Sequence, residues 1–389
     1  MKKYMKRFLK LSATDFTHDS RNERELEVVR SLGYEIVIIG RKTDRNGDFA
    51  VPDCTAIWKT VEPLTPVINS KAVNRLFSVI PWAIEARKQK ADIISCHDIA
   101  YLFVGWLSTL GMKRKPKLIY DSHEFEYERA GERGKMLRFF VKHIERFLIK
   151  KCAFAMVVND TFADEVKKLH KLKIRPVVVR NIPEKWEGDF SISQNLRNEF
   201  IKKNKLKDDV FICMYHGAIC EGRGIEPCVK AIAQIPNAIL IILGNGDVQK
   251  YKDIVSECGN ESKVFFIDAV PRKVLLQYVA IANVGMVLIE PICKSYYYSL
   301  PNKLFENIQS ETPVIASDFP ELSRVVNSYS IGICVNPQNI SEITEAIIKM
   351  KNDVSFYNKC KQNLDKAKYQ LCWENERKIL YNAYSQITI

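Results

Sequence analysis

The segment YYYSLPNKLFENI (296–308) holds the residues whose types and spacing best suit a charged ligand. Ser299 is predicted to cap a helix, whose first turn then offers free N–H groups and a positive dipole to a phosphate. Ser299, Leu300 and Lys303 are therefore candidates for binding a diphosphate. Glu306 lies one turn further along and could accept both hydroxyls of a ribose. The plainer alternative is an ion pair between Lys303 and Glu306 on a solvated helix face.

Two glycine-rich turns in the same half of the chain could contribute to the same site. HGAICEGRG contains Gly217, which lets the backbone approach a ligand, and Arg223, whose guanidinium can contact a diphosphate through paired donors. LGNGD contains Gly244 and Asn245, which could line the base or ribose of a nucleotide. Each turn alone is at least as typical of a structural turn as of a ligand site, and LGNGD is more typical of a structural one.

Polar residues also follow apolar runs in the first half of the chain. Asp121 and His123 end the stretch KLIYDSHE, and Asp15, His18 and Arg21 lie in a polar loop after the first apolar run. A histidine directly after a buried strand can hydrogen-bond to sugar hydroxyls, although a lone histidine more often has a structural role. We expect these residues to bind an acceptor.

Apolar runs alternate with amphipathic segments and predict the elements that position these residues. Strands are expected at 7–13, 35–40, 92–96, 116–121, 153–158 and 176–179, then at 210–215, 238–243, 263–267, 284–289, 313–316 and 331–335. Helices are expected at 20–32, 71–90, 98–111 and 133–151 and between the later strands. This repeated strand–helix–strand order predicts an α/β fold with parallel sheets covered on both faces.

A polar segment with proline and glycine, 183–194, interrupts the alternation and is predicted to link two doubly wound domains. These are residues 1–182 and residues 195–371. The amphipathic segment 372–389 has no strand after it and could pack on either domain. Because parallel sheets bind ligands at the carboxyl ends of their strands, we expect the functional residues to line a cleft between the domains.

The composition of the 389-residue chain predicts a folded protein that stays in the cytosol. It is 47% hydrophobic, yet no apolar run reaches the ~18 residues that span a bilayer. The basic N-terminus has neither the apolar core nor the cleavage site of a signal peptide. The eleven cysteines include no C-x-x-C pair, which favours buried reduced thiols over a zinc or redox site.

The net charge of +13 predicts an anionic partner. Five of the first ten residues are basic, and 133–151 holds seven basic residues against Glu145 alone. In 133–151, apolar residues recur at helical spacing: Leu137, Phe140, Val141, Ile144 and Phe147 or Leu148. The segment is either a domain helix with a solvated charged face or a helix whose basic face lies on anionic lipid headgroups. No nucleic-acid-binding motif accompanies the charge.

The order and spacing of these segments resemble glycosyltransferase family 4, the group 1 enzymes of the GT-B fold, over nearly the whole chain. The resemblance rests on HDSRNERELEVVRSLGYEIVIIG, YDSHE, RNIPE, YHGAICEGRGIEPCVKAI, LGNGD, SLPNKLFENIQSETPVIASDFPEL and WENERKILYNAY. It implies two Rossmann-like domains and a closing helix that returns to the first domain. It also implies retaining transfer of a hexosyl or N-acetylhexosaminyl group from a nucleotide-diphosphate sugar. The implied acceptor is a glycan or a polyprenyl-diphosphate-linked molecule, as in the synthesis of a bacterial surface polysaccharide.

The resemblance also implies roles for single residues. Glu306 matches the second glutamate of the family's E-x7-E motif, which holds the ribose. Arg223 lies where the family usually has a diphosphate-binding lysine, and His123 matches a histidine near the donor sugar and the reacting bond. Two positions depart from the pattern, because Tyr298 replaces the first glutamate and Ala218 replaces an arginine. The loss of the glutamate affects how the sugar ring would be held. The loss of the arginine removes one of two cations that would contact the diphosphate.

We expect Lys303 to supply the missing charge beside Arg223. The sequence contains no D-x-D triplet, so neither a metal nor another cofactor is expected. Two alternatives remain open at this point. One is an epimerase or hydrolase of the same fold, which would act on nucleotide sugars without an acceptor. The other is a non-catalytic basic scaffold on a membrane.

Overall fold

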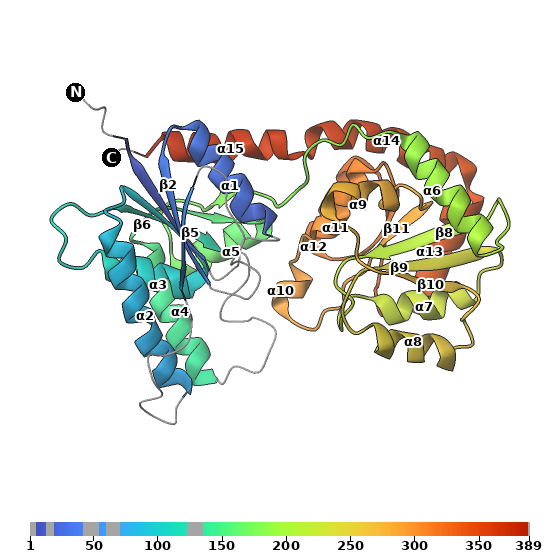
Figure 1. Ribbon diagram of the computed structural model, residues 1–389. Helices are drawn as coiled ribbons and strands as arrows, with labels where there is room; N and C mark the ends of the chain where they lie inside the picture. Colours follow the sequence, from blue (N-terminus) through green and yellow to red (C-terminus); the bar gives the residue numbers. More distant parts are fainter. Residues whose placement is uncertain (1–4, 13–18, 42–53, 60–70, 123–134, 388–389) are drawn as a thin grey trace. The chain divides into compact units, whose positions relative to one another are not determined.

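The computed structural model describes residues 5–12, 19–41, 54–59, 71–122 and 135–387 (Figure 1). Asp15, His18 and His123 lie outside these ranges. The chain forms two compact units. Unit 1 consists of residues 1–181 and 376–389, and unit 2 consists of residues 182–375.

Unit 1 is built on a parallel seven-stranded sheet in the order β3-β2-β1-β4-β5-β6-β7. Its strands are β1 (Arg7–Leu11), β2 (Glu35–Arg41), β3 (Thr55–Lys59), β4 (Ile93–His97), β5 (Lys117–Ser122), β6 (Cys152–Val157) and β7 (Val177–Val178). Its helices are α1 (Ser20–Ser31), α2 (Lys71–Lys88), α3 (Asp98–Ser108), α4 (Lys135–Ile149) and α5 (Asp160–His170). The central strands are buried on both sides, which explains their nearly continuous apolar sequences.

Unit 2 repeats this plan with six parallel strands in the order β10-β9-β8-β11-β12-β13. The strands are β8 (Phe211–His216), β9 (Ala238–Leu243), β10 (Val264–Ile267), β11 (Val284–Val287), β12 (Val314–Ser317) and β13 (Gly332–Val335). The helices are α6 (Phe190–Lys203), α7 (Ile225–Ala233), α8 (Val248–Glu257), α9 (Arg272–Val279), α10 (Lys294–Tyr297), α11 (Asn302–Gln309), α12 (Pro320–Tyr329), α13 (Ile340–Asn352) and α14 (Val354–Gln370).

The last helix, α15 (Trp373–Ser385), begins in unit 2 and continues into unit 1. In unit 1, Tyr384 packs edge-on against Phe8 of β1, with ring centroids 5.8 Å apart. The Tyr384 hydroxyl also donates a hydrogen bond to the buried carboxylate of Glu25 on α1. The end of the chain thus completes the core around the first strand.

The predicted α/β fold is confirmed, and each predicted strand has a counterpart within one or two residues among the described residues. Two expectations need correction. Strand β3 was missed because it is short and lies at the edge of its sheet, where no continuous apolar run is required. Helix α6 begins at Phe190, inside the segment 183–194 predicted as a linker, because the Asp189 carboxylate caps it by accepting from the Ser191 N–H.

The structure also describes all eleven cysteines, and every one is a free thiol. Of the described helices, none combines enough length and apolar character to cross a bilayer.

Candidate functional site

The best candidate site lies at the carboxyl ends of β8 and β11 in unit 2. The strand order of this sheet reverses direction between these two neighbours, and such a switch point is where open parallel sheets bind ligands. The chain leaves β8 through Gly217 and leaves β11 toward Glu290. Helix α11, which carries Lys303 and Glu306, follows β11.

The glycines after β8 and β9 allow two backbone segments to come close together. Gly217 has φ +119° and Gly244 has φ +154°, conformations that side chains rarely permit. A Cβ atom on Gly244 would lie 1.9 Å from the Gly217 carbonyl oxygen. A Cβ atom on Gly217 would meet no atom within 4 Å. The loop after β8 is therefore packed tightly beneath Gly217 and open above it.

This asymmetry predicts different costs for two otherwise identical substitutions. Gly217→Ala strains only the backbone, whereas Gly244→Ala also forces a methyl group into a carbonyl oxygen. We expect Gly244→Ala to lower the free energy of unfolding by about 2 kcal/mol more than Gly217→Ala. Urea denaturation of the two variants without ligand measures this difference, and equal midpoints would contradict the packing described.

Arg223 follows the same loop and is held by an aromatic ring. Its guanidinium carbon lies 4.8 Å from the centre of the Tyr296 ring, in a cation–π contact. Its Nε is buried and has no hydrogen-bond partner among the described residues. Glu290 shapes the backbone around Arg223, because its carboxylate accepts from the Gly224 N–H at 3.2 Å and its own N–H donates to the Gly222 carbonyl.

Lys303 is a second cation in the same place, and unlike the half-buried Arg223 it is buried. Only 7% of its surface is exposed, and its Nζ has no hydrogen-bond partner among the described residues. The Nζ lies 4.1 Å from the centre of the Tyr215 ring. Burial, together with the like charge of Arg223, lowers the pKa of Lys303 to about 7. Two cations whose like charges repel each other, with Lys303 Nζ and Arg223 Nε unpaired among the described residues, form a site suited to an anion.

Glu306 lies one turn beyond Lys303 and faces a different partner. Its carboxylate is 2.9 Å from Nε2 of His216, the last residue of β8. The histidine is buried, while 21% of the Glu306 side chain is exposed. The carboxylate is thus fixed at one oxygen and accessible to solvent. The expected alternative, a Lys303–Glu306 ion pair on a solvated face, is wrong because Lys303 points into the protein.

The structure shows what three of the predicted ligand residues contact, and the predicted helix cap at Ser299 is wrong. Ser299 does not cap α11, because Pro301 occupies the cap position and the Ser299 hydroxyl donates to the Tyr296 carbonyl at 2.7 Å. Leu300 packs on the apolar core of unit 2. The Asn245 side chain accepts from the Ala269 N–H at 3.2 Å, so it joins the loops after β9 and β10.

In unit 1, the predicted residues Arg21 and Asp121 form a buried ion pair. The Arg21 guanidinium donates to both oxygens of Asp121, at 2.7 to 3.1 Å, and to the Val179 carbonyl. Asp121 has no exposed surface. This geometry favours a role in positioning the strand ends of unit 1 over direct contact with an acceptor.

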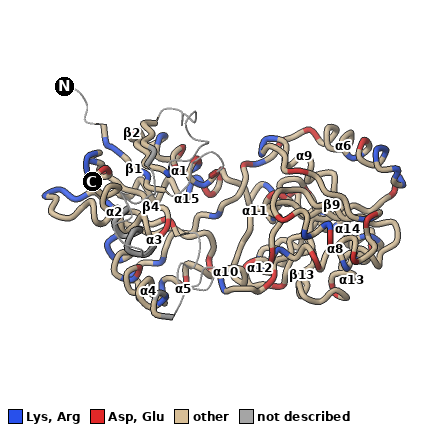
Figure 2. The backbone as a smooth tube through the Cα atoms, turned by 60° about the horizontal axis from the view of Figure 1, so that its bottom comes forward, with Lys and Arg blue, Asp and Glu red and all other residues tan. Residues whose placement is uncertain are grey.

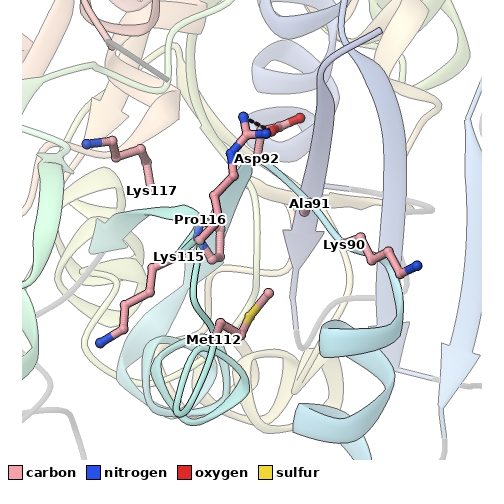
Figure 3. Close-up of a pocket in the computed structure, with 8 residues that line it drawn as sticks. Lys90, Ala91, Asp92, Met112, Lys115, Pro116 and Lys117 are labelled. Atoms are coloured by element: carbon pink, nitrogen blue, oxygen red, sulfur yellow. Dashed lines mark hydrogen bonds and ion pairs between the residues drawn. The ribbon is translucent and has the colours of Figure 1, made fainter. Parts of the chain in front are cut away.

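A hollow of about 300 Å³ in unit 1 does not coincide with these residues. It lies at the amino ends of β4 and β5, the sheet edge opposite the one that binds ligands in this class of fold. Figure 3 shows Lys90, Lys115 and Lys117 pointing away from one another around it. These lysines therefore do not converge on a single ligand.

Within the described ranges, no three His, Cys, Asp or Glu side chains gather closely enough to hold a metal ion. Metal-independent chemistry remains a prediction.

Two family models match successive parts of the chain. Residues 26–182 match the model described as Glycosyltransferase Family 4, and residues 197–367 match the model described as Glycosyl transferases group 1. The chain is a GT-B glycosyltransferase of family 4. The residues quoted above for this resemblance lie in both units.

Similar proteins agree with this assignment. An uncharacterised glycosyltransferase from Methanocaldococcus jannaschii is 25% identical over 301 residues, which is 76% of this chain and 75% of that protein. Sucrose-phosphate synthase from Thermosynechococcus elongatus has the same fold, with a TM-score of 0.76 and 19% identity over 98% of this chain and 99% of the other. HepE from Anabaena, solved in complex with UDP and glucose, gives a TM-score of 0.74 at 13% identity over 99% and 100%.

The glycosyltransferase also has site residues that the sequence did not single out. His216 orients Glu306, Tyr296 supports Arg223, and the Tyr215 ring lies against Lys303. The Tyr215 hydroxyl donates to the carbonyl of Ala218, the residue that replaces a family arginine. Two sequence features pointed to these residues: the end of the buried strand β8 and the run of tyrosines. Neither feature specifies which side chain faces which partner.

Proposed function

We propose that this glycosyltransferase moves a hexosyl or N-acetylhexosaminyl group from a nucleotide-diphosphate sugar to an acceptor, with retention at the anomeric carbon. The proposed acceptor is a glycan or a polyprenyl-diphosphate-linked molecule in the synthesis of a cell-surface polysaccharide. Retention and the class of acceptor rest on the family resemblance. Donor binding rests on the geometry of unit 2.

One observation carries the donor proposal: the buried Lys303 and the half-buried Arg223 are close enough for their charges to interact, and Lys303 Nζ and Arg223 Nε have no hydrogen-bond partner among the described residues. Burying a cation without a hydrogen-bonded counter-ion costs several kcal/mol. A diphosphate would satisfy both groups with charge-assisted hydrogen bonds and would remove this cost. The first turn of α11 adds N–H groups next to Lys303.

Glu306 fits the ribose of the same nucleotide. Its carboxylate accepts from His216 through one oxygen, and its exposed surface leaves room for two hydroxyl donors. A ribose placed there would follow a diphosphate at Lys303 along the same helix. The order of groups in a nucleotide-diphosphate sugar therefore matches the order of residues on α11.

In the proposed reaction, the bond between the anomeric carbon and the diphosphate oxygen breaks, and the acceptor oxygen bonds to the same face of that carbon. The acceptor proton passes to the leaving diphosphate. Lys303 and Arg223 stabilise the negative charge that develops on this leaving group. They act without reorganising, because the fold already holds them in place.

For the acceptor, we propose the strand ends of unit 1. Arg21 and Asp121 position this region, and Asp15, His18 and His123 keep their predicted roles as groups that contact the acceptor. His123 is proposed to lie near the reacting bond.

The test is a screen for the release of nucleoside diphosphate from a panel of nucleotide sugars, with and without glycan and polyprenyl-diphosphate acceptors. UDP-sugars are the first donors to try, because HepE was solved with UDP. We expect release that depends on acceptor, persists in excess EDTA and yields a product with the anomeric configuration of the donor.

Other results would overturn parts of this proposal. Release of free sugar or an epimer without acceptor would assign a hydrolase or epimerase. Loss of activity in EDTA would contradict metal independence, and an inverted product would contradict retention. Failure of every nucleotide diphosphate to stabilise the protein against heat would leave a scaffold role.

A further inference from the structure

Helix α4 in unit 1 turns its apolar stripe toward solvent. Met136, Phe139, Phe140, Ile144 and Phe147 recur at helical spacing, and each leaves between 42% and 73% of its surface exposed. An ordinary domain helix with a solvated charged face, one of the two alternatives that the sequence left open, would bury these apolar positions. Phe140, Ile144 and Phe147 are instead exposed. Soluble proteins rarely expose a contiguous row of large apolar side chains unless the row contacts another surface.

A buried polar contact fixes this orientation. Glu145 lies on the inner side of α4, where only 2% of it is exposed. Its carboxylate accepts from the Tyr120 hydroxyl of β5 at 2.8 Å and lies 3.3 Å from Nε2 of His170 on α5. Rolling the helix to bury the phenylalanines would withdraw this carboxylate from both partners, which is costly inside a protein. The outward apolar stripe is therefore a stable feature of unit 1.

The exposed stripe is supported from beneath and rimmed by positive charge. The Phe147 ring packs edge-on against Trp106 of α3, with centroids 5.6 Å apart. The Phe139 ring lies 4.0 Å from the His143 ring. Lys and Arg recur along the helix, as Figure 2 shows, and Arg138 is exposed. Lys150 and Lys151 are exposed just after the helix ends.

From this arrangement we infer that α4 is an interfacial helix that inserts its phenylalanines into the boundary of an anionic lipid bilayer, while the flanking cations contact the headgroups. An apolar face rimmed by Lys and Arg matches the chemistry of such a boundary, where acyl chains lie just below negative charge. In insertion the apolar stripe provides part of the affinity for the membrane. In adsorption through the basic face alone, only the cations would provide it. This inference does not depend on the proposed donor chemistry.

The test measures partition of the purified protein onto vesicles containing phosphatidylglycerol, by co-sedimentation. We expect Phe139→Ser/Phe140→Ser to weaken partition about 30-fold, because two half-exposed phenylalanines no longer enter the bilayer. Both rings contact only residues of the exposed face in the contacts described, so the fold should be retained. Ile174→Ser is the matched control, because Ile174 is 78% exposed in the same unit but follows α5 and is not part of α4. It should leave partition unchanged.

Salt and lipid composition separate insertion from its alternatives. Binding should weaken but persist in about 0.5 M salt, because salt screens the contacts between the cations and the headgroups but not the apolar contacts. Binding should also fall on neutral phosphatidylcholine vesicles. Complete loss in salt, or equal partition of the double variant, would overturn insertion. A concentration-dependent dimer that the double variant abolishes would assign the face to a second copy of the chain. Acceptor-dependent release of nucleoside diphosphate with a soluble acceptor would be unaffected by any of these outcomes.

Discussion

Lys303→Met is expected to lower kcat/KM about 1000-fold, because the transition state loses a preorganised cation on the leaving diphosphate. The same substitution should make the protein more stable. In the absence of ligand, Lys303 is a buried amine without a hydrogen-bond partner among the described residues, whereas methionine fills a similar volume without charge. Steady-state kinetics and chemical denaturation of the same preparation measure both effects.

The stability gain should depend on pH in a defined direction. Burial, with the like charge of Arg223, sets the folded-state pKa of Lys303 to about 7, below the ordinary value of 10.5. Between these values the unfolded chain binds a proton that the folded protein has lost, so wild-type stability rises with pH across this window. The advantage of methionine should therefore be about 5 kcal/mol below pH 7 and should fade toward pH 10.5.

Lys273→Met is the control, because Lys273 is an exposed lysine of α9 in the same unit. It should change neither kcat/KM nor the pH dependence of stability. If Lys303→Met kept activity within a few-fold of wild type, Lys303 would not be the cation that replaces the family arginine. If it lost activity and stability together, the loss would reflect a structural role.

Glu306→Gln is expected to weaken donor binding about 100-fold, because an amide offers a neutral oxygen and a donor where two ribose hydroxyls need a charged acceptor. His216 should remain folded in place, since the amide oxygen can still accept from Nε2. Titration calorimetry with the nucleoside diphosphate released in the donor screen measures the effect directly.

A 2′-deoxynucleotide separates recognition of the ribose from a general effect on the site. It should bind the wild type much more weakly than the ribonucleotide, yet bind Glu306→Gln about as well as the ribonucleotide does. Equal discrimination by both proteins would show that Glu306 does not contact the sugar hydroxyls. The substitution His216→Gln tests whether His216 holds the Glu306 carboxylate in place. We expect it to weaken donor binding less than Glu306→Gln does.

The fold was predictable because parallel strands buried on both faces leave an unmistakable apolar pattern. The pattern marked β8, β9 and β11, and the residues following these strands included Gly217, Arg223 and Gly244. Sequence periodicity does not determine side-chain direction at a helix start, so the burial of Lys303 was not visible. Neither was the contact between His216 and Glu306, which joins residues 90 positions apart.

Helix α4 shows the limit of the same reasoning. Its spacing correctly predicted an amphipathic helix, but spacing alone left open which face of the helix points into the unit. Glu145 decides the orientation, because one of its carboxylate oxygens accepts from the Tyr120 hydroxyl and the other lies 3.3 Å from His170 Nε2 inside the unit. One buried hydrogen-bonded residue outweighs the periodicity of its whole helix, and sequence patterns do not include such distant partners.

The position of Tyr384 has a consequence for how the chain folds during its synthesis. Domains generally fold as units while the chain emerges, from the N-terminus onward. Here Tyr384, on the last helix, adds a hydrogen bond to Glu25 and a ring contact to Phe8. The first 181 residues of unit 1 therefore leave the ribosome before the helix that supplies these two contacts, and unit 1 gains them only after unit 2 has been synthesised. The unit begun first is the one finished last.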